Sequence, residues 1–246
     1  MNEDIRAKFK PDIHPETLPQ QNGILLCMGN EYLDGDNRKY MKMYDWMAAI
    51  YDVGERWLGR MLYGNAIIRL RQQLMQMLPW RDGASVLYVS IGTGADLRYL
   101  PPGIHPETLD CFGADISLGM LKKCRANWRK KARITLVQCP AENLPFADDA
   151  FDIVFHNGGF NFFNDKPRAA AEMMRVAKSG STILIADETG DFVDAQYKKS
   201  LFSRKYFEGA SVDLSEIKAA LPPDAEDKHM RLLWDGRFYA MTFGKP

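Results

Sequence analysis

The stretch that most constrains the fold is residues 85–100, where a buried strand ends in a sharp turn on two glycines. The run begins with apolar residues rich in β-branched side chains, such as Val86 and Val89, which predicts a strand covered on both faces. Gly92 and Gly94 follow in the order Gly-Thr-Gly, and the apolar residues after them have helical spacing. A strand, a glycine-rich turn and a helix start are typical of nucleotide cradles, because the glycines let the backbone approach a ligand. Gly-Thr-Gly also occurs in ordinary turns between a strand and a helix, so features elsewhere in the chain have to decide between the two.

Apolar strands and helices alternate through most of the chain. Beyond the strand at residues 85–89, strands are expected at residues 109–114, 134–139, 151–156 and 182–186, and a closing hairpin at residues 230–234 and 238–243. Helices are expected at residues 65–78, 117–131, 167–178 and 214–221. This alternation predicts an α/β fold, a Rossmann-like doubly wound sheet of seven strands, mostly parallel, with one antiparallel strand from the C-terminal hairpin. Ligands of such sheets bind at the carboxyl ends of the strands.

The N-terminal part of the chain has a different character. Residues 1–38 are polar and contain several prolines, apart from an apolar patch at residues 24–28, and they predict an arm with one short strand. From residue 39 the apolar spacing is helical, which predicts an N-terminal helical cap. We therefore expect a single domain at residues 39–246, divided into a helical lid at 39–80, a ligand-binding core at 84–188, a variable substrate region at 190–228 and a closing hairpin at 229–246.

The composition excludes several kinds of function. Lys and Arg together number 32, as do Asp and Glu, so the overall charge indicates neither nucleic acid nor a membrane surface as a partner. The most basic run, residues 122–133, has the spacing of the solvated face of a helix. The four cysteines are widely spaced, so neither a metal site nor a disulfide framework is expected. No segment has the apolar length of a secretion signal or a membrane span, and the protein is expected to be cytoplasmic.

Asp115 ends the second expected strand, at the edge where ligands of such a sheet bind. An acid there can accept hydrogen bonds from both hydroxyls of a ribose, and Ile116 after it can pack on a purine ring. Alternatively, Asp115 begins the next helix as an acid favoured by the helix dipole. Asp187 and Glu188 follow the fifth strand at the same edge, where they either orient a substrate amine or cap the loop.

Two further blocks carry a resemblance to a known family. Residues 141–154 read Ala-Glu-Asn-Leu-Pro-Phe-Ala-Asp-Asp-Ala-Phe-Asp-Ile-Val, and residues 172–181 read Glu-Met-Met-Arg-Val-Ala-Lys-Ser-Gly-Ser. With these blocks, residues 40–188 resemble the class I S-adenosylmethionine-dependent methyltransferases, in the group that includes the ubiquinone and menaquinone ring methyltransferases. The C-terminal hairpin is similar to the end of that family, whereas residues 1–38 and 190–228 lie outside the resemblance.

The resemblance implies S-adenosylmethionine as the cofactor and S-adenosylhomocysteine as the product. The positions that it assigns to the cofactor are, in chain order, Tyr51, Tyr88, Gly92, Thr93, Gly94, Asp115, Ile116, Ala141, Glu142 and Asn157. The glycine turn would lie along the methionine part of the cofactor, and Asp115 would hold the ribose hydroxyls. Ala141 and Glu142 would lie at the edge of the adenine. Asn157 would border the methyl-transfer site.

Two residues are candidates for the methyl-transfer step itself. His156 ends the fourth expected strand and is the best-placed histidine for a general base, although a hydrogen-bonded spacer is an equal alternative. Tyr44 lies in the run Met-Tyr-Asp-Trp-Met-Ala-Ala-Ile-Tyr-Asp at residues 43–52, which resembles the lid helix of the family. A tyrosine of that helix can approach the sulfonium. For Tyr44 and Tyr51 the alternative is packing in the core.

The chain departs from the family pattern at three positions around the cofactor. Tyr88 stands where the family usually has an acid that helps to hold the amino group of the cofactor, and Ser90 stands where it usually has a glycine. Pro140 stands where an acid often contacts the adenine. Asp96 or backbone carbonyls could take over the amino group. These departures keep open the hypothesis of a cofactor-binding regulator that has lost its chemistry.

The aromatic residues Phe160, Phe162 and Phe163 beside the expected methyl-transfer site favour a small apolar or aromatic substrate, unless they pack a lid on itself. The expected function is therefore S-adenosylmethionine-dependent methyl transfer to such a molecule. The alternatives are a methyltransferase that acts on RNA or protein, and the non-catalytic regulator. A nicotinamide dehydrogenase is disfavoured, because the block at residues 141–154 has no role there. The sequence predicts no metal site and no particular oligomeric state.

Overall fold

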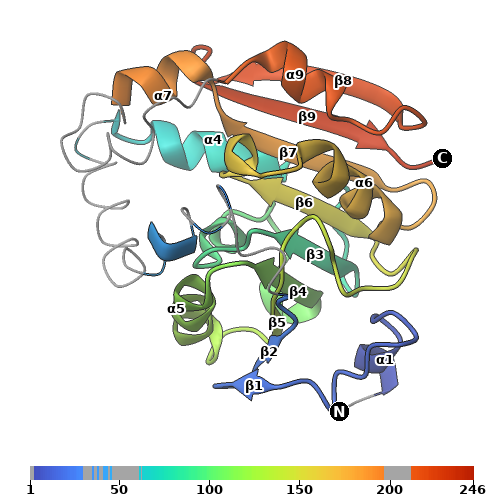
Figure 1. The fold of residues 1–246 in the computed structure, drawn as a ribbon. Coiled ribbons are helices and arrows are strands. Elements are labelled where there is room, and N and C mark those ends of the chain that lie inside the picture. The colour runs from blue at the N-terminus through green and yellow to red at the C-terminus, as the bar shows by residue number, and fades with distance from the viewer. Residues whose placement is uncertain are drawn as a thin grey trace.

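The computed structural model describes residues 3–29, 35, 38, 41–43, 45, 61, 63–196 and 212–246. Within these residues, nine strands form one sheet in the order β1-β2-β5-β4-β3-β6-β7-β9-β8 (Figure 1). The strands are β1 (Gln20–Gln21), β2 (Ile24–Leu26), β3 (Ser85–Val89), β4 (Asp110–Asp115), β5 (Ile134–Gln138), β6 (Ile153–Asn157), β7 (Thr182–Glu188), β8 (Glu226–Leu233) and β9 (Phe238–Gly244). The helices are α1 (Glu3–Arg6), α4 (Ala66–Met75), α5 (Leu118–Trp128), α6 (Lys166–Val176), α7 (Gly190–Gln196) and α9 (Leu214–Ala219), with the 3-10 helices η2 (Ala95–Arg98), η3 (Pro106–Thr108) and η4 (Phe160–Phe162). The expected Rossmann-like α/β fold is confirmed.

The expectation of seven strands was wrong, because the N-terminal arm adds β1 and β2 to the described sheet. β2 pairs parallel to β5 and buries Ile24 and Leu25, which are 0% and 4% exposed. β1 precedes β2 and pairs antiparallel to it. The two strands are joined by Asn22 and Gly23, whose φ angles of 54° and 70° suit a tight turn. β1 consists of two glutamines, so no apolar pattern in the sequence predicts it. The short strand expected from the apolar patch is confirmed as β2.

The strand order places the centre of the sheet at β3, between β4 and β6. Val89, the last residue of β3, is paired with Ala114 of β4 and with His156 of β6, so the carboxyl ends of these strands lie side by side. β9 runs antiparallel to β7, as expected for the hairpin, and β8 forms the outer edge. The expected cap helix over residues 39–62 falls almost entirely outside the described residues, whereas the helix expected after it is α4.

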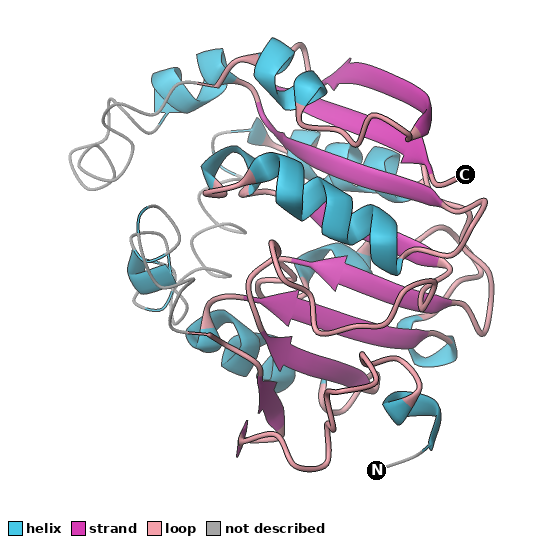
Figure 2. Ribbon diagram, turned by 45° about the vertical axis from the view of Figure 1, so that its right-hand side comes forward, coloured by secondary structure: helices cyan, strands magenta, loops and turns pink. Residues whose placement is uncertain are grey.

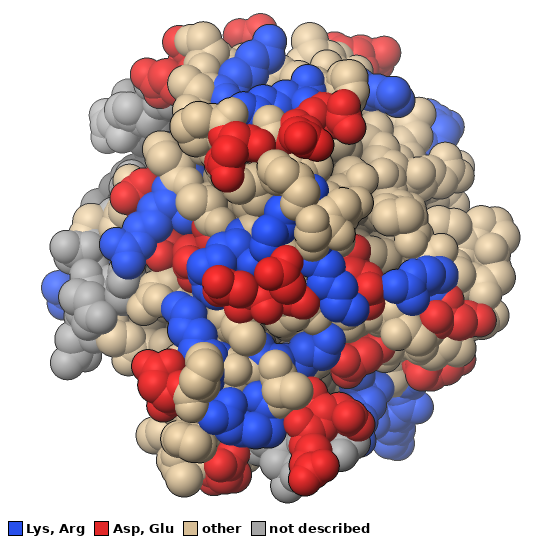
Figure 3. All heavy atoms as spheres, turned by 90° about the vertical axis from the view of Figure 1, so that its right-hand side faces the viewer, with Lys and Arg blue, Asp and Glu red and all other residues tan. Residues whose placement is uncertain are grey.

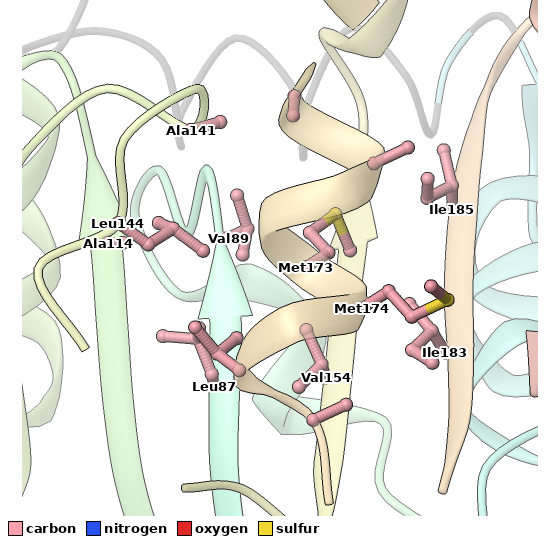
Figure 4. Packing of buried hydrophobic residues seen from close by; sticks show 14 of the residues in the cluster. Leu87, Val89, Ala114, Ala141, Leu144, Val154, Met173, Met174, Ile183 and Ile185 are labelled. Atoms are coloured by element: carbon pink, nitrogen blue, oxygen red, sulfur yellow. The ribbon is translucent and has the colours of Figure 1, made fainter. Parts of the chain in front are cut away.

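Helices cover both faces of the sheet, because side chains along each buried strand alternate between the faces. Leu87 and Val89 pack in the cluster that contains Met173 and Met174 of α6 (Figure 4). Tyr88, between them in the chain, belongs to the opposite cluster, which α4 and α5 cover. Figure 2 shows α6 lying across one face of the strands. The sheet is therefore doubly wound, with its parallel part buried on both sides.

The N-terminal arm belongs to the same core, since Phe9 is 2% exposed and its ring centroid lies 5.2 Å from that of Phe146. We expect Phe9→Ala to lower the free energy of unfolding by about 3–5 kcal/mol, because it removes a buried ring and leaves a cavity. Urea denaturation measures this loss. The matched control is Leu232→Ala, at a leucine that is 56% exposed, where a change below about 0.5 kcal/mol is expected. If the two variants lost the same free energy, the arm would not be packed on the core.

Candidate cofactor and methyl-transfer site

The turn after β3 is built on residues with positive φ, namely Ser90 at 54°, Gly92 at 55° and Gly94 at 74°. A side chain at such a φ is strained, which explains why glycine suits the position of Ser90. Gly94 packs directly on α5, since a Cβ at this residue would lie 2.5 Å from Trp128 Nε1. The same indole nitrogen donates a hydrogen bond to the Gly94 carbonyl at 3.1 Å. Helix α5 therefore closes the turn from one side, and the helix expected after the turn is only the 3-10 helix η2.

The hydroxyl of Thr93 lies in this turn without a hydrogen-bond partner among the described residues, although Thr93 is only 2% exposed. The carbonyl of Thr93 accepts a hydrogen bond from Asn127 Nδ2 at 3.2 Å, so α5 also holds the backbone here. A buried hydroxyl without a partner costs free energy that a polar ligand can recover. The turn therefore fits a ligand that brings a polar atom to Thr93.

Asp115 joins the end of β4 to the glycine turn and to α5. Its Oδ2 accepts a hydrogen bond from the Gly92 amide and its Oδ1 accepts one from the Ser117 amide, both at 2.8 Å. Ser117 caps α5, since its Oγ accepts a hydrogen bond from the Met120 amide. Burial raises the pKa of Asp115 to about 6, and the amide bonds offset only part of that rise. The acid fixes the start of α5, and its oxygens keep lone pairs for the hydroxyls of a ligand. Both expected roles of Asp115 are therefore compatible with its geometry.

Asp45 reaches the same helix start from the N-terminal part of the chain. Its Oδ1 accepts hydrogen bonds from Ser117 Oγ at 2.6 Å and from the Gly119 amide at 2.8 Å. Gly119 leaves room for this contact, since a Cβ there would lie 2.9 Å from the Cα of Asp45. No local pattern singles out Asp45, because its partners lie 72 and 74 residues further along the chain. Tyr44 and Tyr51, the expected lid tyrosines, lie outside the described residues.

Tyr88, which stands at the family's acidic position, lies beneath the turn. Its hydroxyl donates a hydrogen bond to Asp96 Oδ2, while Arg71 of α4 donates one to Oδ1 of the same carboxylate. Asp96 is 1% exposed, and Arg71 neutralises its charge. The Tyr88 ring stacks on Phe155 with 4.1 Å between centroids. The acid near the turn is thus Asp96, held inside the protein by a tyrosine and by an arginine that the sequence pattern did not reveal.

The segment after β5 lies beside the segment after β4. Gln138, the last residue of β5, donates a hydrogen bond from Nε2 to the carbonyl of Ile116 at 3.0 Å. Ala141 and Glu142 follow, and they are 8% and 3% exposed. Arg168 of α6 donates a hydrogen bond from Nε to the Glu142 carbonyl at 2.8 Å, which fixes this segment against the helix. The hydrogen bond from Gln138 therefore fixes the half-buried Ile116 beside the end of β5, from which the chain leads to Ala141 and Glu142.

His156, the candidate general base, is fully buried near the end of β6 and packs edge-on against two aromatic rings. The ring centroids of Phe160 and Phe163 lie 5.8 and 5.2 Å from that of the imidazole. Neither ring nitrogen has a hydrogen-bond partner in the described part of the chain. Burial lowers the pKa of His156 to about 3, and the Ala186 carbonyl, which falls short of a hydrogen bond, offsets only part of this. The imidazole is therefore neutral at pH 7 and a weak base, but it can both donate and accept a hydrogen bond.

A second buried acid, Asp187, ties the loop after β6 to the end of β7. Its Oδ2 accepts a hydrogen bond from the Asn161 amide and its Oδ1 accepts one from the Glu188 amide, both at 2.8 Å. The Asn161 side chain extends the network, since its Oδ1 accepts a hydrogen bond from the Tyr239 hydroxyl at 2.9 Å. Burial raises the pKa of Asp187 to about 6. Of the two roles expected for Asp187, this geometry matches the loop cap.

One edge of the sheet thus gathers most of the expected site, at the carboxyl ends of β5, β4, β3 and β6. The residues gathered there are Gly92, Thr93, Gly94, Asp115, Ile116, Ala141, Glu142, His156 and Asn157. Across the described ranges, no three His, Cys, Asp or Glu side chains are grouped so that they could hold a metal ion. Nor does any helix in those ranges have the length and apolar character needed to cross a membrane.

Comparison with known proteins gives a consistent picture. Residues 87–185 match the family model described as a methyltransferase domain. The chain is similar to the demethylmenaquinone methyltransferase of Renibacterium salmoninarum, with 32% identity over 161 residues that cover 65% of this chain and 63% of that protein. It is also similar to the ubiquinone/menaquinone biosynthesis C-methyltransferase UbiE of Geobacter sulfurreducens, with 32% identity over 148 residues that cover 59% of this chain and 56% of the relative. The chain therefore spans about three fifths of the length of these curated relatives.

Solved structures share the fold. Phosphoethanolamine N-methyltransferase 2 of Haemonchus contortus, solved in complex with S-adenosyl-L-methionine, superposes with a TM-score of 0.58 at 17% identity. The match covers 88% of this chain and 59% of that one. At such low identity the likeness concerns the fold alone.

The buried acid Asp187 makes stability depend on pH. Its pKa in the folded protein, about 6, lies above the ordinary 3.8, so the folded state binds this proton more tightly than the unfolded chain does. The free energy of unfolding therefore falls as the pH rises through this window, by about 3 kcal/mol for a shift of about two pK units. We expect the stability of the wild type relative to Asp187→Asn to fall by that amount between about pH 4 and about pH 7.

Urea denaturation across this pH range measures the difference. Asp224→Asn, at an exposed carboxylate, is the matched control, and its difference from the wild type is expected to stay flat. The difference in free energy of unfolding between the wild type and Asp187→Asn is the quantity that decides. If this difference stayed constant or rose with pH, the raised pKa of Asp187 would be contradicted.

Proposed function

Because residues 87–185 form a methyltransferase domain of the class I, S-adenosylmethionine-dependent kind, we propose that this protein transfers a methyl group from S-adenosylmethionine to a small apolar or aromatic molecule. The observation that carries the proposal is the Asp115 carboxylate, which accepts hydrogen bonds from the Gly92 amide and the start of α5 inside the matched region. Such an acid beside a glycine turn suits a ribose. The turn adopts the required backbone even though Ser90 replaces a glycine, which weakens the case for a non-catalytic regulator.

The residues at this edge fit the cofactor. The unpartnered Thr93 hydroxyl can meet a polar atom of the ligand, and Asp115 can accept hydrogen bonds from its ribose hydroxyls. The half-buried Ile116 can offer an apolar side chain to an adenine, and Ala141 and Glu142 can offer backbone groups. We assign the cofactor to Tyr51, Tyr88, Gly92, Thr93, Gly94, Asp115, Ile116, Ala141, Glu142 and Asn157, with S-adenosylhomocysteine as the product. In this assignment Tyr88 acts through Asp96, which it positions beneath the turn.

When bound, S-adenosylmethionine supplies a methyl group that is already activated on a sulfonium, so the protein contributes mainly alignment. His156 and Tyr44 are the proposed residues at the reacting end. A neutral imidazole with a pKa of about 3 is suited to orient an acceptor by a hydrogen bond rather than to remove a proton. Phe160 and Phe163 exclude water from the side of the imidazole that they cover.

The proposed acceptor is a ring such as a quinone or its precursor. Phe163, which packs on His156 and is half-buried, offers an apolar surface to such a ring, and the buried Phe160 supports it. The relatives from R. salmoninarum and G. sulfurreducens bear the names of menaquinone and ubiquinone methyltransferases, and this chain aligns with part of their length. In this proposal the segment at residues 39–80 closes over the cofactor, and the segment at residues 190–228 contacts the acceptor.

Calorimetry with S-adenosylmethionine and S-adenosylhomocysteine tests the cofactor assignment. We expect the wild type to bind both ligands and Asp115→Ala to bind them about 100-fold more weakly or not at all, because two charge-assisted hydrogen bonds are lost. Asp115→Asn, which keeps one acceptor oxygen, should bind with intermediate affinity. Asp224→Ala, which removes an exposed carboxylate, is the control and should bind like the wild type.

Two results would count against the proposal in different ways. Equal affinity in the wild type and in a folded Asp115→Ala variant would remove the ribose role of this acid. Failure of the wild type to bind either ligand at millimolar concentration would remove the methyltransferase function itself. A methyl-release assay with simple quinols then tests the acceptor class.

A further inference from the structure

A pocket lies between α5 and the turn that joins β1 to β2, away from the edge of the sheet that carries the candidate site. It has a volume of about 430 Å³ and is lined by Asn22, Lys122, Arg125, Ala126 and Arg129. None of these residues belongs to the proposed methyl-transfer site. We infer that this pocket binds the phosphate group of an anionic ligand, either a lipid headgroup or a soluble phosphate ester.

The first argument is the charge of the pocket. Lys122, Arg125 and Arg129 are spaced so that they share one face of α5. Residues 116–141 contain no Asp or Glu, and residues 17–30 contain no charged residue at all. In a chain whose formal net charge is zero, this positive excess is therefore local. Like charges at such spacing repel one another and destabilise a helix. A bound anion would therefore relieve the repulsion among the three basic side chains, which no acidic residue in the surrounding sequence offsets.

Other basic side chains of the protein are paired with carboxylates. Arg175 pairs with Asp148 at 2.6 Å and Lys245 pairs with Asp149 at 2.8 Å. Figure 3 shows basic and acidic side chains next to one another on the face at the right-hand side of Figure 1. Among the described residues, by contrast, no carboxylate lies within ion-pair distance of Lys122.

The second argument is that one of the basic side chains is held in a fixed position by the turn of the arm. Asn22 and Gly23 form the turn between β1 and β2 with φ angles of 54° and 70°. Arg125 lies directly beneath this turn, since a Cβ on Gly23 would lie 2.6 Å from its Nη2. Its Nη1 donates a hydrogen bond to the Gly23 carbonyl at 3.3 Å. The guanidinium is thereby held in place before a ligand arrives, which lowers the entropy lost on binding.

The donor set identifies the chemistry of the ligand. Two guanidinium groups and an ammonium supply only donors, and the Asn22 amide can add another, which suits an anion with several oxygens. The lining contains no aromatic side chain on which a base could stack, so single-stranded nucleic acid is disfavoured. The helix face that was expected to be only solvated is therefore bordered by the turn of the arm, which forms an open, basic pocket with it.

The test compares the full chain with a double variant, Lys122→Gln with Arg129→Gln, which leaves Arg125 under the turn. The matched control is Lys218→Gln with Arg231→Gln, which removes the same charge from exposed positions on α9 and β8. The probes are pyrophosphate, followed by calorimetry, and phosphatidylcholine vesicles with or without phosphatidylglycerol, followed by co-sedimentation. The wild type is expected to bind pyrophosphate, the anionic vesicles or both. Each basic side chain beside an anionic surface strengthens binding about fivefold, so the double variant should bind about 25-fold more weakly.

The outcomes separate the sources and can overturn the proposal. Binding to the anionic vesicles alone assigns a lipid headgroup, and binding to pyrophosphate assigns a soluble phosphate. Equal weakening in the control variant would mean a general charge effect and would overturn the proposal, as would failure of the wild type to bind either pyrophosphate or the anionic vesicles. S-adenosylmethionine affinity should be the same in all three proteins, so failure here is distinguishable from failure of the proposed methyl transfer.

Discussion

The buried carboxylate of Asp115 connects the three segments from which the candidate site is built. Its two oxygens accept hydrogen bonds from the Gly92 amide of the turn and the Ser117 amide at the start of α5, both at 2.8 Å. A buried carboxylate is costly unless it is hydrogen-bonded, and the pKa of about 6 indicates that these two bonds offset only part of the cost. A ligand that donates further hydrogen bonds to this carboxylate would therefore bind to a site that is already organised but not yet satisfied.

Two other loops at this edge of the sheet, after β3 and after β6, are fixed by contacts of the same kind. Beneath the glycine turn, Asp96 is held by Tyr88 and Arg71. Beside the end of β6, Asp187 holds the backbone of the loop that carries Phe160. Both carboxylates are at least 98% buried. The site therefore consists of short loops on a rigid sheet. Because these loops are already held in place, little motion has to be suppressed when a methyl donor is positioned there.

Much of this edge could be predicted from local sequence. The apolar run before Gly92 predicted β3, the period of the apolar residues predicted most helices, and the sheet rules placed Asp115 beside the turn. What could not be predicted depends on partners far apart in the chain. Nothing near Tyr88 in the sequence indicates that its hydroxyl meets Asp96 together with Arg71 of α4.

The arm and the histidine illustrate the same limit. β1 is too short and too polar to have a periodic signal, and it forms because β2 offers it an unpaired edge. His156 was correctly placed near a strand end, but its low pKa follows from burial between rings of a loop whose packing the sequence does not specify. Local pattern thus located the strand ends and the glycine turn, whereas protonation states and side-chain partners required the three-dimensional structure.

Hydrogen–deuterium exchange of the full chain with and without S-adenosylhomocysteine tests the central claim most directly, because it reports on the backbone amides of the turn and of the α5 start. The account predicts slower exchange at residues 90–96 and 115–121 when the ligand is present, with no change in β8, which lies at the far edge of the sheet. Unchanged exchange in both segments at a saturating ligand concentration, or protection confined to other parts of the chain, would contradict it.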